Sequence, residues 1–109
     1  PCALPILRNI HVGDLVRVEA LLVNTTERSM HVALRVYASR RTGAESRLVA
    51  HSIAVMVDVS AEGQAQPVRQ YVPESESARR LQETAIELVR MRSEVSAAWT
   101  EMRRSTDPR

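Results

Sequence analysis

The chain has 109 residues, of which 44% are hydrophobic and 26% are charged, and these values describe one ordinary soluble domain. A chain of this size buries about 60–70% of its unfolded surface, which supports one core and not two. No apolar run approaches the ~20 residues that a membrane span needs, and no cationic and then apolar start indicates a signal peptide. A single cysteine, Cys2, excludes an internal disulfide framework, so we expect a reducing compartment, the cytoplasm.

Residues 1–72 are rich in valine and carry three alternating apolar patterns. The third pattern has apolar residues on both sides, which is typical of a central strand covered on both faces. The connectors 24–28 and 40–45 are short, so they fit antiparallel hairpins and exclude a parallel crossover. Turn residues at 60–63 close the third pattern. We therefore predict an antiparallel meander of three long strands, which span 14–22, 30–38 and 47–58.

Residues 73–109 predict a long helix and a short tail. Pro73 ends the extended stretch, and Ser75 or Ser77 is placed to cap the first helical turn. About thirty residues make a helix roughly 45 Å long, more than a three-stranded meander covers, so we expect part of it to pack on another chain or on structure outside this sequence. Its apolar stripe recurs at alternating spacings of four and three residues, through Leu81, Ala85, Leu88, Arg92, Val95, Trp99 and Met102.

Motifs for catalysis or metal binding are almost absent from the sequence. It has no glycine-rich phosphate loop, no metal-spaced Cys/His set and no Gly-x-Ser-x-Gly elbow. His11, His31 and His51 fall on different predicted segments, so we interpret them as polar-face or strand-packing residues and expect no metal. Cys2 has no assignable base and is interpreted as an inert thiol. An excess of only two positive charges, with Tyr37 nearly alone as an aromatic platform, argues against nucleic-acid binding.

One local pattern is more specific. The run NIHVGDLV at 9–16 leads into the first predicted strand, a polar turn follows, and the third strand runs out to EG at 62–63. These motifs resemble the second half of the hotdog-fold acyl-CoA thioesterases, and the step YVPE at 71–74 looks like the C-terminal extension of that family. The resemblance implies an α+β fold: a hotdog-like antiparallel sheet, of which 1–72 is the strand portion, followed by a long C-terminal helix and a short tail in 73–109.

The sequence also departs from the family pattern. Asn9 stands where the family prefers proline, and Thr26 and Arg28 replace a glycine and a threonine of the turn. In these enzymes a helix that carries the catalytic Asp, Asn or Glu comes before the His-Val-Gly-Asp segment, so the catalytic residue stays unknown here. The sequence opens without an initiator methionine in what looks like the middle of a domain, and we expect it to be the C-terminal portion of a longer protein. The family uses the residue at Asp14 mainly to shape the turn.

The resemblance implies a function as well. The family hydrolyses the thioester of fatty acyl-CoA to free acid and CoA, and we expect a cytoplasmic homo-oligomer that uses CoA only as part of the substrate, with no separate cofactor and no nucleic-acid or membrane partner. A carboxylate activates water or attacks the thioester carbonyl, and backbone N–H groups stabilise the oxyanion. Candidate CoA-binding residues are Arg28 and Ser29, near the pantetheine or phosphates, and Arg40 and Arg41, at the nucleotide phosphates.

Two other interpretations stay open. A non-catalytic hotdog acyl-binding or assembly module would keep the sheet and lack the chemistry, in keeping with the missing catalytic segment and the altered turn at Thr26 and Arg28. The stripe from Leu81 to Met102 is alternatively a helix-pairing surface, although Arg92 within it argues against a dry, symmetric coiled coil.

Overall fold

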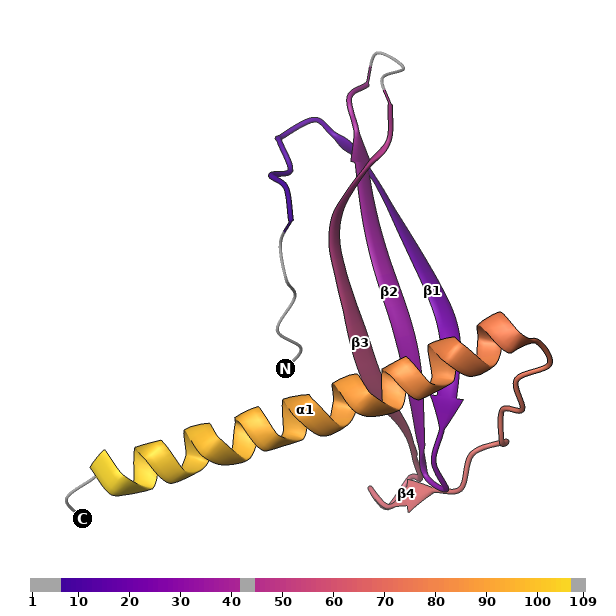
Figure 1. Cartoon of the computed structure of the whole chain (residues 1–109), viewed down its shortest axis with the longest axis vertical. Helices are drawn as coiled ribbons and strands as arrows, with labels where there is room; N and C mark the ends of the chain where they lie inside the picture. The colour runs from indigo at the N-terminus through magenta and orange to yellow at the C-terminus, as the bar shows by residue number, and fades with distance from the viewer. Residues whose placement is uncertain (1–6, 42–44, 107–109) are drawn as a thin grey trace.

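The computed structural model describes residues 7–41 and 45–106, so Cys2 and part of the connector 40–45 lie outside the described residues. An antiparallel sheet with the strand order β1-β2-β3-β4 is followed by one long helix (Figure 1). The predicted α+β class and the predicted meander are therefore confirmed. The elements are β1 (Leu15–Thr25), β2 (Ser29–Ser39), β3 (Arg47–Val59), β4 (Ala65–Gln66) and α1 (Glu76–Thr106).

The central long strand is β2, which pairs with β1 on one side and with β3 on the other. The expectation that the third predicted strand is central and covered on both faces is wrong within the described residues. Strand β3 pairs with the two-residue β4 only at Asp58 and Val59, and the sequence did not predict β4. The apolar residues near the end of β3 stay about half exposed, for example Val55 at 44% and Met56 at 52%.

Two register shifts give the sheet its most buried side chains. Leu22 pairs with Val32 and Asn24 pairs with His31, so Val23 is an extra residue in β1. The second shift lies in β3. There Ala50 pairs with Val36 of β2 and Leu48 pairs with Tyr37, so Val49 is an extra residue. Val23 and Val49 are the largest fully buried side chains of the described residues. A bulge bends its strand and re-aims the side chains around it, and here both bulges turn a valine into the core.

The two faces of the sheet differ in chemistry. Cross-strand partners lie on the same face, so His31, Arg35 and Ile53 share the face that α1 crosses. No described helix covers the other face. Most of its residues are apolar: Val16, Val18, Ala20, Leu22, Met30, Val32, Leu34, Val36, Ala38, Ala50, Ala54 and Met56. Ser52 lies among them, and Thr25 and Arg47 lie on the same face at its two ends.

Helix α1 begins where the sequence places its cap. The Ser75 hydroxyl accepts a hydrogen bond from the backbone N–H of Ala78 at 3.1 Å, which satisfies one free donor of the first turn. The helix crosses the three long strands near the β1–β2 turn and then continues past β3 (Figure 1). No helix in the described ranges is both long enough and apolar enough to cross a membrane.

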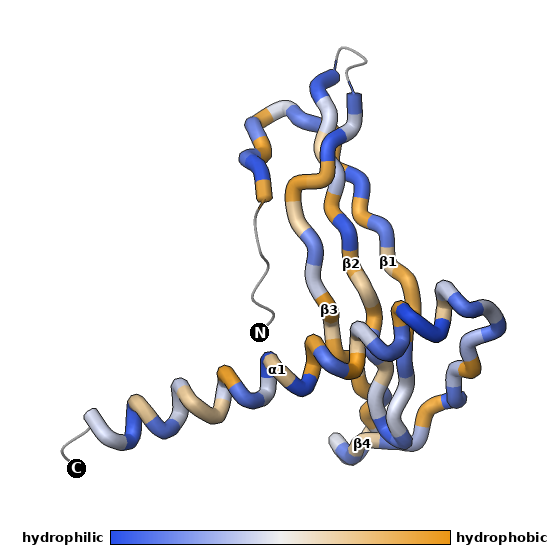
Figure 2. Tube along the Cα trace, viewed as in Figure 1, coloured by the Kyte–Doolittle hydropathy of each residue, from blue (hydrophilic) through white to orange (hydrophobic). Residues whose placement is uncertain are grey.

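The buried face of α1 coincides with the predicted stripe only at Ala85 and Arg92. The least exposed positions in its sheet-covering half are Ala78, Gln82, Ala85, Val89 and Arg92, whereas Leu81 and Leu88 are 39% and 46% exposed. Periodicity alone could not locate this line, because Gln82 and Arg92 face the sheet through hydrogen bonds rather than through apolar contact. Apolar positions recur along α1 and past the edge of the sheet (Figure 2).

We expect Val49→Ala to lower the free energy of unfolding by about 2 kcal/mol, because the side chain is fully buried at a bulge. The matched control is Val55→Ala on the same strand, where the half-exposed side chain should change stability by less than about 0.5 kcal/mol. Urea denaturation of both variants measures the difference. Equal losses in the two variants would contradict the packing described here.

Candidate functional site

The predicted CoA-binding residues Arg28 and Ser29 lie in the tight turn between β1 and β2. Thr26 closes the turn: its N–H donates to the Ser29 carbonyl at 2.9 Å, and its hydroxyl accepts from the Ser29 N–H at 3.1 Å. The two hydroxyls of Thr26 and Ser29 are 2.5 Å apart. Ser29 therefore has a defined structural role in this turn, in which Thr26 stands where the family pattern has glycine.

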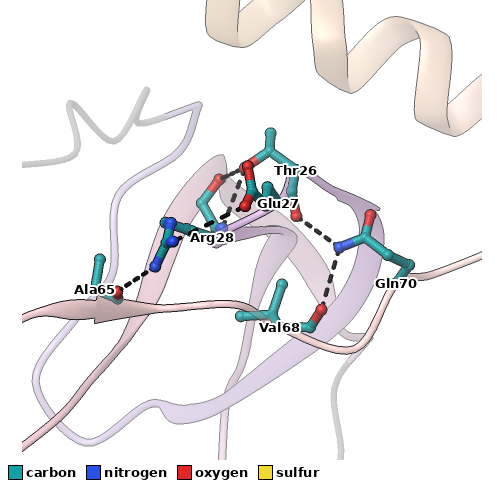
Figure 3. A network of polar contacts seen from close by, with 7 residues as sticks. Thr26, Glu27, Arg28, Ala65, Val68 and Gln70 are labelled. Atoms are coloured by element: carbon teal, nitrogen blue, oxygen red, sulfur yellow. Dashed lines mark hydrogen bonds and ion pairs between the residues drawn. The ribbon is translucent and has the colours of Figure 1, made fainter.

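Arg28 fastens this turn to β4, and Glu27 and Gln70 join it to the segment after β4 (Figure 3). Its guanidinium donates to the carbonyl of Ala65 at 2.7 Å and lies 3.9 Å from the Glu27 carboxylate. The Val68 N–H donates to the Glu27 carbonyl at 3.0 Å, and the Gln70 amide donates to the carbonyls of Thr26 and Val68. The side chain of Arg28 remains 52% exposed, so it is held in place while one side stays open to solvent.

The other predicted pair, Arg40 and Arg41, lies at the opposite end of the sheet. Both residues follow the end of β2 and are exposed. Ser29 is the first residue of β2 and Arg40 follows its last, so the two are about 36 Å apart along an extended strand. One chain therefore does not bring the two pairs together, and their contact with CoA stays a prediction.

The motif at 9–16 forms a turn that Asp14 holds. The buried Asp14 carboxylate accepts hydrogen bonds from the His11 N–H at 3.0 Å and from the Arg47 guanidinium at 2.9 Å. Gly13 adopts a φ of +95°, a left-handed conformation that favours glycine. The hydrogen bond from His11 and the adjacent Arg47 lower the pKa of Asp14. The expectation that Asp14 shapes this turn is therefore confirmed.

A buried polar network under α1 was missed by the sequence reasoning. The Gln82 amide donates to Asn24 Oδ1 at 3.0 Å, and Asn24 Nδ2 lies 3.1 Å from His31 Nδ1. Asn24 and His31 are only 6% and 5% exposed. Burial, followed by the positive charge of Arg92, lowers the pKa of His31, which favours the neutral ring. The sequence did predict strand packing for His31, but only the bulge at Val23 places Asn24 beside it.

A groove of about 300 Å³ lies between α1 and the sheet. Its lining combines apolar side chains, such as Ile53 and Leu88, with the cationic or titratable groups of Arg35, His51 and Arg92. The Arg92 guanidinium donates to the Ile53 carbonyl at 2.6 Å. No carboxylate lines this groove, and the described residues include no cluster of three or more His, Cys, Asp or Glu side chains that could hold a metal. The groove therefore offers apolar walls and basic side chains to a ligand.

Comparison with solved structures places the fold among acyl-CoA thioesterases. The chain is 30% identical to an apo-hexameric acyl-CoA thioesterase, with a TM-score of 0.75 over 87% of this chain and 61% of that one. It is 22% identical to an acyl-CoA hydrolase from Bacillus cereus, with a TM-score of 0.79 over 97% of this chain and 65% of that one. It is 20% identical to an acyl-CoA hydrolase from Staphylococcus aureus in complex with butyryl-CoA, CoA and CoA disulfide, with a TM-score of 0.74 over 94% of this chain and 63% of that one.

The chain thus spans less than two thirds of the length of these structures. No family model matches the sequence, and no curated protein matches it. The resemblance to hotdog-fold acyl-CoA thioesterases inferred from the motifs is nevertheless confirmed by the structural matches, and the chain has a hotdog-like α+β fold.

The lowered pKa of His31 predicts a pH dependence of stability. The unfolded chain takes up the proton near pH 6.5, whereas the folded chain takes it up at lower pH. The stabilisation by neutral His31 is therefore complete above about pH 6.5 and is lost as the pH falls from there through the folded pKa. We expect urea midpoints to fall between pH 7.5 and 5.5 in the wild type, and to fall less in His31→Gln.

The matched control is His51→Gln, because His51 is exposed. This variant should follow the wild-type pH dependence. Parallel curves for the wild type and His31→Gln would show that the buried ring is not the source of the effect.

Proposed function

We propose that this chain supplies the sheet and C-terminal helix of an acyl-CoA thioesterase, which hydrolyses the thioester of fatty acyl-CoA to free acid and CoA. The observation that carries the proposal is the 30% identity and TM-score of 0.75 to an acyl-CoA thioesterase, over 87% of this chain. The motif at 9–16 supports it, because its turn is built as the family resemblance implies. The protein acts as a cytoplasmic homo-oligomer, in keeping with the hexameric state of two similar structures.

The catalytic carboxylate of this reaction is not Asp14. A general base works best with a pKa near the working pH, whereas the hydrogen bonds from His11 and Arg47 hold Asp14 in its turn and lower its pKa. The groove lined by Arg35, His51 and Arg92 contributes no carboxylate either. In the proposal the chain described here contributes walls and CoA contacts, and the carboxylate comes from a part of the protein outside the described residues.

The candidate CoA contacts divide between two ends of the sheet. Arg28 and Ser29 lie at the β1–β2 turn, and Arg40 and Arg41 lie at the far end of β2. Exposed guanidinium groups bind phosphate through paired hydrogen bonds, so Arg40 and Arg41 are assigned to the nucleotide phosphates. The separation along β2 means that one CoA molecule contacts both pairs only where neighbouring copies bring them together.

The direct test is hydrolysis. We expect the protein that carries this chain, expressed from its complete reading frame, to release free CoA thiol from acyl-CoA substrates, butyryl-CoA included. A series of acyl-chain lengths, followed with a thiol-reactive dye, measures the activity. Absence of turnover at every chain length would contradict the thioesterase assignment.

The phosphate contacts predict a specific change in KM. The double variant Arg40→Ala/Arg41→Ala should raise KM for acyl-CoA by about tenfold or more, since a hydrogen bond to a charged group contributes about 1.5–3 kcal/mol. It should leave KM unchanged for the same acyl group on a short pantetheine analogue without phosphates. The control is Arg79→Ala, an exposed arginine of α1. An equal effect on both substrates would remove these two residues from the CoA site.

A second candidate is a non-catalytic hotdog module that binds acyl groups or assembles with partners. The specific observation in its favour is the groove under α1, which has apolar walls and three basic side chains, from Arg35, His51 and Arg92, but no carboxylate. This candidate predicts calorimetric binding of acyl-CoA with no release of thiol. The two measurements together separate the enzyme from the module.

A further inference from the structure

Helix α1 has two halves with different surroundings. In the half that covers the sheet, Ala85 is 2% exposed and Gln82 is hydrogen-bonded to Asn24 of β1. From Ser93 to Thr106 every residue is exposed, and this part of the helix extends past β3 (Figure 1). That stretch is about 21 Å long. None of residues 7–41 and 45–92 buries this stretch, so its apolar side chains are open to a partner outside the described residues.

An apolar stripe runs along α1 beside the face that meets the sheet. Leu81, Leu88, Val95 and Met102 recur every seven residues, and Trp99 and Met91 widen the line. We call these six residues the α1 stripe. Their exposure rises from 39% at Leu81 to 58% at Trp99. A seven-residue apolar repeat is the pattern with which one helix packs along another.

Arg92 does not interrupt this stripe as the sequence suggested. Its guanidinium donates to the Ile53 carbonyl of β3 at 2.6 Å, so the charge is directed to the chain's own sheet. Between Val95 and Met102 the only charged residue is Glu101, which lies on another face of α1, and Arg103 borders the stripe four residues after Trp99. The main objection to a helix-pairing surface therefore does not apply to the exposed half.

The charges of α1 favour an identical partner. Arg90 is paired with Glu87 and Glu94, and Arg104 lies 3.6 Å from Glu101, so these charges offset one another within the helix. A partner that carries a charged surface gains little from such a helix. A second copy presents the same uncharged stripe, and a two-fold axis between copies makes the contact self-complementary.

We propose that the α1 stripe is the surface through which a second copy of this chain packs, helix against helix. The inference rests on the homo-oligomer of the proposed function and names its interface, but it does not depend on thioesterase activity. The contact buries Val95, Trp99 and Met102, which the single chain leaves more than half exposed.

The test is the mass of the protein in solution, measured by light scattering after size exclusion. The double variant Val95→Glu/Trp99→Glu should lower the mass by about twofold, because it places charges in a symmetric apolar contact. The control Ala97→Glu adds one of the same charges on the opposite side of α1 and should leave the mass unchanged. Circular dichroism checks that the helix remains.

A charge-exchange experiment keeps the inference testable if the glutamate variant is poorly folded. Val95→Arg/Trp99→Arg should be dissociated alone, and mixing it with the glutamate variant should restore the wild-type mass, since opposite charges then meet across the contact. Restoration identifies the second copy as the partner. A mixture that stays dissociated, although each variant keeps its helix, would overturn the inference.

Other results of the mass measurement would overturn the proposed interface. A wild-type monomer, or an unchanged mass in the glutamate variant, overturns the inference. Val18→Glu probes the uncovered apolar face of the sheet, where Val18 is 59% exposed. If only that variant dissociates, copies meet through the sheet and not through α1. The mass is measured without substrate, so failure of hydrolysis and failure of this interface are recorded separately.

Discussion

The structure depends on how α1 is held across the sheet, and the buried network of Gln82, Asn24 and His31 does this. Unpaired buried polar groups are costly, so the hydrogen bond from the Gln82 amide to Asn24 Oδ1 favours this placement of the helix. The bulge at Val23 is the origin of this arrangement: in an unbroken register Val23, not Asn24, would stand opposite His31. One extra residue in β1 therefore places a polar side chain, Asn24, opposite His31 under the helix.

Arginine side chains connect the remaining parts of a chain with little core. Arg28 reaches the carbonyl of Ala65, Arg47 reaches those of Asn9 and Ala38, and Arg92 reaches that of Ile53. The contacts with Ala65, Asn9 and Ile53 join residues 37 to 39 positions apart in the sequence. A guanidinium carries several donors in a rigid plane, so one side chain can hold a turn, a strand and a carboxylate together, as Arg47 does with Asp14. The use of arginine as the only basic residue besides histidine has this structural counterpart.

The sequence was sufficient to predict those features of the fold that depend on local sequence patterns. Alternation predicted the three long strands, and short polar connectors predicted their antiparallel pairing. Ser75 or Ser77 was expected to cap α1, and the structure has Ser75 as the cap. The resemblance located the turn that Asp14 closes. The features that the sequence did not predict depend on contacts between residues distant in the chain. No local signal announces the bulges at Val23 and Val49, and the rotation of α1 about its axis follows from hydrogen bonds to the sheet rather than from its apolar stripe. The candidate CoA residues were predicted from local sequence motifs alone. In the structure Ser29 lies at one end of β2 and Arg40 lies just past the other end.

The overhanging half of α1 behaves geometrically as a lever. Its fulcrum is the place where Gln82 and Arg92 are bonded to the sheet. A tilt of about 10° at that point displaces the far end of the overhang, about 21 Å away, by roughly 4 Å. Small adjustments in the polar contacts under the helix are thereby magnified at its tip, so the placement of the C-terminal residues is governed by side chains that lie well away from them.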